Sequence, residues 1–331
     1  MERIAPFTLC RPASLAEAAA LLAATPGARP LAGGTDLLPN LRDGLGEPPA
    51  LIDLAGIAEL SVIALARDGT TIGSGITLAR IASDDALRKV FPVLAEAAAT
   101  VAGPGHRTVA TLGGNLCLDT RCVFYNQSEW WRRSKNFCLK YGGTLCHVAP
   151  HGEHCHAAFS GDLAPALLVL DAEVEIVGPD GLRRMRLAEL YVEDGARHLA
   201  LLPGEIVAAI RIPGQPANAR SGYRKARARG AIDFPLAGVA ARVEIVDDRP
   251  SGLRVALTGT NSRPFLLAGV DALVADSAFE DMLAGLGKLV QKQVSPMRTT
   301  VTHSNYRRQV ASVLAQRLVR ELAQRGAASP G

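Results

Sequence analysis

The stretch ARPLAGGTDLLP, residues 28–39, places two adjacent glycines between two apolar segments. Glycine adopts positive φ readily and lets the backbone approach another group closely. The pattern therefore predicts a short strand, a tight turn at Gly33 and Gly34, and an apolar exit from that turn.

A second glycine pair lies in RTVATLGGNLC, residues 107–117. In turns of this kind successive backbone N–H groups can converge into a nest, which suits a pyrophosphate. Small polar residues beside the two glycine pairs could add side-chain hydrogen bonds: Thr35, Asp36, Thr111 and Asn115. Two such segments favour a dinucleotide site, and the alternative is a pair of plain tight turns.

Other common nucleotide and catalytic motifs fit this chain poorly. There is no G-x-x-x-x-G-K-[ST] segment, and GSGITL, residues 73–78, lacks the third glycine of a Rossmann dinucleotide site. There is also no H-E-x-x-H motif and no convincing Ser/His/Asp spacing. The sequence therefore favours neither a phosphate loop nor a nicotinamide site.

The length and composition indicate two or three packed globular units. The 331 residues are 48% hydrophobic and 21% charged, with a net charge of only +4. The short basic runs at 130–135 and 223–229 are expected to be solvated or ligand-facing, so we expect no nucleic-acid partner. No apolar segment has the length to span a bilayer, and residues 1–14 lack the features of a signal peptide. We therefore expect no membrane partner and a cytoplasmic location, where thiols stay reduced.

Hydrophobic periodicity predicts alternating helices and strands before residue 118. Ser14 and Glu17 have the spacing of a capping box at the start of a helix over 14–24. The other elements expected in this part are a strand at 49–57, a strand that leads into a helix at 70–82, and a helix at 90–103.

A second regular part begins at the segment GDLAP, residues 161–165, and predicts a helix, a strand, a Pro-Asp-Gly turn and another strand. A strand is expected at 205–213, and the polar connector at 214–222 marks a domain boundary. Strands and then helices follow, which suggests a second α+β layer. The last helix carries an apolar stripe at Val310, Val313, Leu314, Leu318 and Leu322.

Residues 118–159 interrupt this pattern. Five of the six cysteines lie within 117–155, and four of the seven histidines lie within 138–156. Seven of the 15 aromatic residues also lie in this segment, so we expect an ordered, packed loop. Reduced cysteines in such a cluster favour metal or redox chemistry, and the residues alone leave zinc and an iron–sulfur cluster open.

Several motifs in order carry a resemblance to a known family: LAGGTDLLP, TLGGNLC, GDLAPALLVLDAEVEI, GEIVAAIRIP and GYRKARARGAIDFPLAGVAARVEI. The chain resembles the FAD-binding, or medium, subunits of the molybdenum hydroxylases, which include xanthine and carbon monoxide dehydrogenases. This resemblance implies an α+β FAD-binding domain of the vanillyl-alcohol-oxidase type over residues 1–216, built from two subdomains. A C-terminal α+β domain of the carbon monoxide dehydrogenase flavoprotein type is implied over 217–331.

The resemblance also implies the contacts to FAD. Two segments should wrap the pyrophosphate and adenosine: Arg29, Pro30, Leu31, Ala32, Gly33, Gly34, Thr35 and Asp36, then Thr111, Leu112, Gly113, Gly114 and Asn115. Asp162, Val207 and Lys225 match further positions near the cofactor. From the residues alone, Asp162 could instead cap a helix, Val207 could be plain core, and Lys225 could be a surface lysine.

The insertion, residues 118–159, resembles one subgroup, the β subunits of 4-hydroxybenzoyl-CoA reductases. The shared sequence segments are TRC, FYNQSEWWR, CLKY and CHV. The resemblance implies a [4Fe–4S] cluster bound by Cys122, Cys138, Cys146 and Cys155. Cys117 is then a packing residue, and the loop histidines would tune the cluster without binding it. A zinc-stapled module without a redox role is the alternative.

The implied activity is electron transfer without any catalytic residue in this chain. The implied partners are a large molybdopterin subunit and a small subunit with two [2Fe–2S] clusters, in a heterotrimer that dimerises. A low-potential donor such as ferredoxin would supply electrons for reductive dehydroxylation of 4-hydroxybenzoyl-CoA in anaerobic aromatic degradation. A related hydroxylase that acts on another aromatic substrate is the second interpretation.

Overall fold

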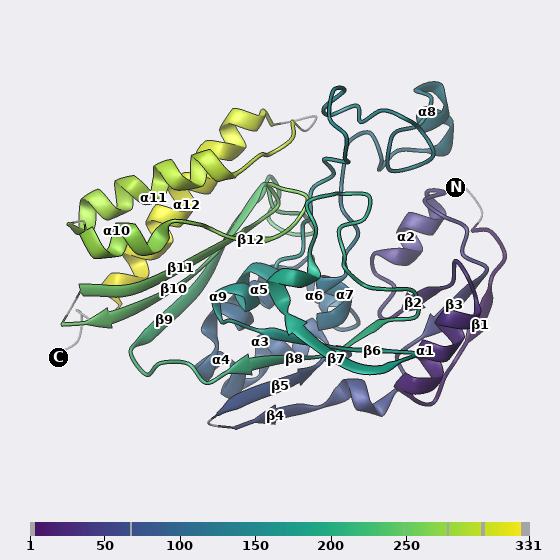
Figure 1. The fold of residues 1–331 in the computed structure, drawn as a ribbon, viewed down its shortest axis with the longest axis horizontal. Coiled ribbons are helices and arrows are strands. Elements are labelled where there is room, and N and C mark those ends of the chain that lie inside the picture. Colours follow the sequence, from purple (N-terminus) through teal and green to yellow (C-terminus); the bar gives the residue numbers. More distant parts are fainter. Residues whose placement is uncertain (1–3, 67, 248, 277, 299–301, 326–331) are drawn as a thin grey trace.

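The computed structural model describes residues 4–66, 68–247, 249–276, 278–298 and 302–325. Three sheets follow one another across the molecule, as Figure 1 shows: a small N-terminal sheet, a central sheet and a C-terminal sheet covered by long helices. The α+β architecture expected from the sequence is confirmed.

The N-terminal sheet is parallel, with strand order β1-β3-β2. Ser14 caps the helix beside it, because the Ser14 hydroxyl accepts a hydrogen bond of 3.2 Å from the Glu17 N–H. The Glu17 carboxylate in turn accepts a hydrogen bond of 2.8 Å from the Ala13 N–H. The elements of this part are β1 (Thr8–Cys10), α1 (Leu15–Ala24), β2 (Arg29–Leu31), α2 (Leu37–Arg42) and β3 (Ala50–Asp53).

The central sheet is antiparallel, with strand order β4-β5-β8-β6-β7. Strand β8, which comes from a segment remote from β5 in the sequence, fills the centre of the sheet and is the last strand before the expected domain boundary. The strands are β4 (Ile63–Leu65), β5 (Gly69–Gly73), β6 (Glu173–Gly178), β7 (Gly181–Arg186) and β8 (Ile206–Pro213), with 3₁₀ turns η1 (Ala58–Ser61) and η2 (Leu187–Leu190).

Short helices pack against the central sheet. The predicted helix over 90–103 is shorter than expected: it ends at Thr100, and Val101 already has an extended backbone. The helices in this part are α3 (Leu78–Ser83), α4 (Asp85–Val90), α5 (Pro92–Thr100), α6 (Pro104–Arg107), α7 (Leu112–Leu116) and α9 (Leu163–Val169).

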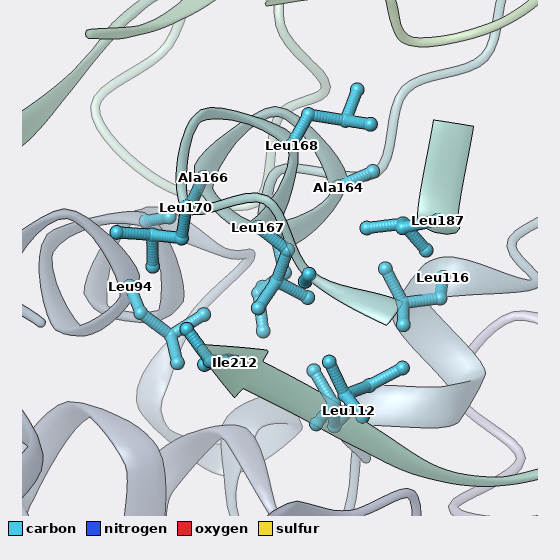
Figure 2. Close-up of a cluster of buried hydrophobic side chains, with 14 of the residues drawn as sticks. Leu94, Leu112, Leu116, Ala164, Ala166, Leu167, Leu168, Leu170, Leu187 and Ile212 are labelled. Atoms are coloured by element: carbon cyan, nitrogen blue, oxygen red, sulfur yellow. The ribbon is translucent and has the colours of Figure 1, made fainter. Parts of the chain in front are cut away.

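One apolar core joins α7 to α9 and the central sheet, as Figure 2 shows. Leu112 and Leu116 of α7 are completely buried there, together with Leu167 of α9 and Ile210 of β8. Burying a leucine side chain contributes about 1.5–3 kcal/mol. The second glycine segment is therefore fixed in place by the leucines on either side of its glycines.

The C-terminal sheet is antiparallel, with strand order β12-β11-β10-β9, and its helices cover one face. Leu318 and Leu322 of the last helix are buried as expected, but Val313 is 40% exposed. Ala311, Ala315 and Val319 supply the rest of the buried face. The elements are β9 (Ala219–Ala226), β10 (Ala237–Val246), β11 (Arg249–Thr258), β12 (Phe265–Leu266), α10 (Val270–Asp276), α11 (Phe279–Gln293) and α12 (Ser304–Gln324).

The insertion projects from the body of the molecule above α2 in Figure 1, and it carries the short helix α8 (Glu129–Ser134). Its two ends meet in a bridge: the Arg121 N–H donates to the Ala158 carbonyl at 2.7 Å, and the Ala158 N–H donates back at 2.8 Å. In the part of the chain that the structure describes, no helix has the length and apolarity needed to cross a membrane.

Candidate flavin and cysteine sites

The first glycine segment forms the turn that the sequence predicts. Gly34 has a φ of +69°, in the left-handed region that favours glycine. Gly33 lies so close to another segment of the chain that a Cβ there would sit 2.0 Å from the Val109 carbonyl oxygen. The turn therefore packs directly against Val109 and Ala110, immediately before the second glycine segment.

The turn leaves backbone donors for a ligand. Among the residues that the structure describes, none accepts a hydrogen bond from the N–H groups of Gly33, Gly34 or Thr35. These groups are half-buried and successive in the chain. An anion such as a pyrophosphate could satisfy them.

The second glycine segment differs from its prediction. It is the short helix α7, with Thr111 at its N-cap, so the expectation of a second glycine turn is wrong. The Thr111 hydroxyl accepts a hydrogen bond of 3.1 Å from the Gly114 N–H. The Leu112 and Gly113 N–H groups donate to the carbonyls of Ile76 and Ser74 at 2.9 and 2.8 Å. The backbone donors of α7 are thus used within the protein, unlike those of the first segment.

Asn115 ties α7 to the next helix. Its side-chain oxygen accepts a hydrogen bond of 3.0 Å from the Leu163 N–H, and the residue is buried. This oxygen is therefore committed to the fold, and any contact of Asn115 with a cofactor would come from other atoms.

Asp36 is also committed to a protein contact. Its carboxylate forms an ion pair with Arg121, whose guanidinium also donates to the Asn40 side chain at 3.0 Å. The same guanidinium lies 4.7 Å from the ring centre of Phe234 in the C-terminal part. Burial lowers the pKa of Arg121 to about 10. Sequence reasoning missed Arg121, which joins the first glycine turn to the stem of the insertion.

Asp162 and Lys225, two of the residues matched to the FAD site, bind each other. The Lys225 ammonium lies 2.9 Å from the Asp162 carboxylate, and their side chains are only 2% and 3% exposed. The Tyr223 hydroxyl donates to the same carboxylate at 2.5 Å. Burial raises the pKa of Asp162, and Lys225 and Tyr223 oppose that shift.

The simpler readings of these two residues are therefore wrong. Asp162 stands at the N-cap position of α9 but makes no side-chain capping hydrogen bond. The side chain of Lys225 is buried, and its ammonium also donates to the Thr100 carbonyl at 3.4 Å. Val207, the third matched residue, is 4% exposed in β8 and packs in the main core. Flavin contacts by these three residues remain predictions.

Four cysteines of the insertion line a single small cavity. They are the four that the sequence singled out: Cys122, Cys138, Cys146 and Cys155. Burial raises the pKa of the Cys122 thiol, and it raises that of the Cys155 thiol to about 12. Among the described residues, no group of three or more His, Cys, Asp and Glu side chains is arranged to hold a single metal ion.

Backbone donors already point at two of the sulfurs. The Phe124 N–H donates to the Cys122 Sγ, and the Ala157 N–H donates to the Cys155 Sγ, each at 3.4 Å. Hydrogen bonds of this kind stabilise thiolates and tune iron–sulfur clusters. Cys117 lies outside the cavity and packs against the main core, as expected.

Aromatic side chains pack around the cavity, as the sequence predicts. Phe124 lies 6.1 Å from Trp131 and 5.3 Å from His147, measured between ring centres. His147 also lines the cavity, and its Nε2 lies 2.7 Å from the Phe137 carbonyl oxygen. Trp130, by contrast, is 76% exposed on α8, so it does not belong to the loop core.

Arg132 fastens the insertion to the body of the protein. Its side chain is 1% exposed and donates to the carbonyls of Gly44 at 2.9 Å and Asp43 at 3.2 Å, and also to that of Gln127. The Tyr141 hydroxyl donates to the Gly44 carbonyl at 2.9 Å. The insertion that contains the cysteine cavity is thus bound to the chain just after α2.

A lysine completes the wall of the cavity. Lys140 is only 5% exposed along its side chain, and its ammonium lies 2.7 Å from the Asp119 carboxylate. It also lies 4.2 Å from the ring centre of Tyr125, which lines the same cavity. Sequence reasoning missed both charged residues, because nothing local shows that Lys140 turns inward.

Comparison with known proteins follows the two halves of this architecture. Residues 5–215 match the family described as the FAD binding domain in molybdopterin dehydrogenase, and residues 221–322 match the CO dehydrogenase flavoprotein C-terminal domain. The chain belongs to the FAD-binding subunits of the molybdenum hydroxylases. The glycine turn with its open N–H groups is therefore part of the FAD-binding domain of this family.

Relatives cover nearly the whole chain. The FAD-binding subunit of an aldehyde oxidoreductase from Escherichia coli K12 is 34% identical over 281 residues, which are 82% of this chain and 87% of the relative. The carbon monoxide dehydrogenase medium chain of Afipia carboxidovorans is 27% identical over 321 residues, or 95% of each chain. A solved carbon monoxide dehydrogenase from Oligotropha carboxidovorans has a TM-score of 0.80 at 24% identity, with 98% and 99% of the two chains covered, and supports the fold.

Proposed function

We propose that this chain is the electron-transfer subunit that carries FAD and one [4Fe–4S] cluster in a molybdenum enzyme of the 4-hydroxybenzoyl-CoA reductase type. One observation carries the proposal: four cysteines spread over residues 122–155 line one cavity in an insertion that is fastened to the FAD-binding fold. When bound, FAD exchanges one or two electrons and the cluster exchanges one.

The first glycine turn supports the FAD assignment. The N–H groups of Gly33, Gly34 and Thr35 have no acceptor among the described residues and would bind the pyrophosphate. The second segment would shape the site mainly through the position of α7, since its own N–H groups are occupied. Asp162, Val207 and Lys225 stay in the proposed site, with Lys225 holding the Asp162 carboxylate.

The choice of a cluster over zinc rests on the resemblance of the insertion and on its four cysteines. A single zinc ion draws four ligands to within about 2.3 Å of one point. A four-iron cluster instead places each thiolate on a different iron, so its ligands surround a larger space. The four cysteines that line one cavity supply the four thiolates that such a cluster needs. The zinc-stapled module remains the competing assignment for the test below.

The insertion also supports the choice of reaction. Its motifs resemble those of 4-hydroxybenzoyl-CoA reductases, where the net reaction joins the substrate with two electrons and two protons to give benzoyl-CoA and water. The substrate would bind the large molybdopterin subunit, so no catalytic residue is assigned here. A related hydroxylase acting on another aromatic compound is the second candidate, since the relatives named above belong to enzymes with different substrates.

The proposed complex contains a large molybdopterin subunit and a small subunit with two [2Fe–2S] clusters, and the heterotrimer dimerises. A ferredoxin-like donor would deliver single electrons at the cluster. Residues 1–216 form the proposed FAD-binding domain, and 217–331 form the C-terminal domain. We place the complex in the cytoplasm, because reduced cysteines are needed to hold the cluster.

The ligand assignment is tested by iron analysis of cysteine variants purified without oxygen. The variants Cys138→Ala and Cys155→Ala should lose most of the chain's iron, while Cys117→Ala, outside the cavity, should keep it. FAD content should stay near one per chain in all three. Unchanged iron in both cavity variants would refute the ligand set, and full zinc occupancy in place of iron would support the zinc-stapled module.

A further inference from the structure

The wall of the cysteine cavity contains one buried positive charge. Lys140 lines the cavity beside the four cysteines, and its side chain is 5% exposed. A buried ammonium is costly unless its donors are satisfied. A charge retained at such a position acts strongly on its neighbours, because the surroundings screen it poorly.

The ammonium is held in place by all three of its hydrogen-bond donors. It lies 2.7 Å from Asp119 Oδ1, 3.0 Å from the Thr120 carbonyl oxygen and 2.6 Å from the Thr120 hydroxyl. Asp119 and Thr120 both belong to the segment that runs from α7 to the stem of the insertion. The position of the charge is therefore set by the fold rather than by a freely moving side chain.

The opposite charge lies on the outer side of this pair. Asp119 contacts the ammonium but is not part of the cavity lining that the described residues form, and its side chain is 23% exposed. Solvent therefore screens the carboxylate more than it screens the ammonium. The electrostatic potential that Lys140 and Asp119 together produce in the cavity is therefore positive.

We propose that Lys140 is a positioning residue that raises the reduction potential of the centre held by the four cysteines. This inference rests on the proposed [4Fe–4S] cluster. Four thiolates give such a cluster a net negative charge, and one-electron reduction adds one more negative charge without breaking a bond. A fixed cation beside it stabilises the reduced state more than the oxidised state, and net charge is one of the factors that set cluster potentials.

The inference predicts opposite effects from removing the two charges. Lys140→Met keeps the length of the side chain but removes the cation, so the midpoint potential should become more negative. Asp119→Asn removes the counter-charge and leaves the ammonium uncompensated, so the midpoint potential should become more positive. Lys140→Arg should stay close to the wild type, because it preserves the charge.

A matched control lies in the same insertion. Lys135 is exposed, and Lys135→Met removes the same charge in a solvated position. Its midpoint potential should match that of the wild type, because water and salt screen that charge.

The experiment is a reductive titration of the complete complex, purified without oxygen and followed by low-temperature EPR of the reduced four-iron centre. Iron and FAD are counted in each variant. With iron retained, an unchanged midpoint in Lys140→Met overturns the inference. If Lys140→Met loses its iron, Asp119→Asn decides: a positive shift supports the inference, and an unchanged or negative shift overturns it. A wild-type complex that holds FAD but no cluster would instead refute the proposed function.

Discussion

Asp162 and Lys225 form a buried ion pair although 63 positions separate them in the sequence. The two charged atoms are 2.9 Å apart, and neither side chain is more than 3% exposed. Asp162 precedes α9 in the FAD-binding part, and Lys225 lies on β9 in the C-terminal part. The pair therefore joins the two family domains beside the proposed flavin site.

Removal of one partner should destabilise the protein strongly. Lys225→Met leaves the Asp162 carboxylate buried without its cation, and such changes cost about 3–5 kcal/mol. Urea unfolding of the flavin-loaded chain measures this loss. The double variant Asp162→Asn with Lys225→Met should lose less than the sum of the two single changes. Strictly additive losses would show that the two residues do not depend on each other.

The close packing of the first glycine turn predicts a sharp effect on flavin binding. A side chain at Gly33 would collide with the backbone at Val109, so Gly33→Val should displace the turn and lower the FAD content of the purified chain. Gly105→Val is the matched control, since a Cβ at Gly105 meets no atom within 4 Å. Equal FAD content in both variants would disprove the role of the turn.

A buried histidine predicts a pH dependence of stability. Burial lowers the pKa of His198 to about 4 from an ordinary value of 6.5. The unfolded chain therefore takes up this proton first, and stability should fall as the pH drops from about 6.5 to about 4. The full effect is roughly 3 kcal/mol.

The variant His198→Gln tests this prediction by urea unfolding at several pH values. It should show a shallower loss of stability across that range, because it lacks the titrating group. His151→Gln, which changes an exposed histidine, should follow the wild type. Parallel curves for wild type and His198→Gln would mean that His198 does not carry the dependence.

The anchoring of the insertion predicts different roles for two adjacent arginines. Arg132 is buried and binds three carbonyl groups, whereas Arg133 pairs with Glu129 at the surface with its side chain 71% exposed. Arg132→Met should loosen the insertion and speed its cleavage by chymotrypsin, which cuts at aromatic residues. Arg133→Met should leave the cleavage rate near that of the wild type, since exposed ion pairs contribute little. Equal rates would contradict the anchoring role.

Local patterns allowed much of the fold to be predicted. The Ser14 and Glu17 spacing predicted a capped helix, and both residues make capping hydrogen bonds. Leu318 and Leu322 were recognised as part of a buried stripe because helical periodicity is visible in the sequence. The four cysteines were singled out partly by resemblance, and the fold brings them to one cavity.

Long-range pairing was beyond the reach of local patterns. The sequence does not show that Lys225 meets Asp162, that Arg121 meets Asp36, or that Arg132 is buried against the chain just after α2. These charges look like ordinary surface residues until the chain folds back on itself. The second glycine segment was predicted as a turn for a similar reason. Its helical form depends on the packing of Leu112 and Leu116 into the core, which local patterns do not show.

The central claim concerns what the cysteine cavity holds, and metal analysis of the full-length chain purified without oxygen tests it most directly. The account predicts about four iron and four sulfide per chain, together with bound FAD and a brown-yellow visible spectrum. Stoichiometric zinc without flavin, or FAD with neither iron nor sulfide, would contradict it.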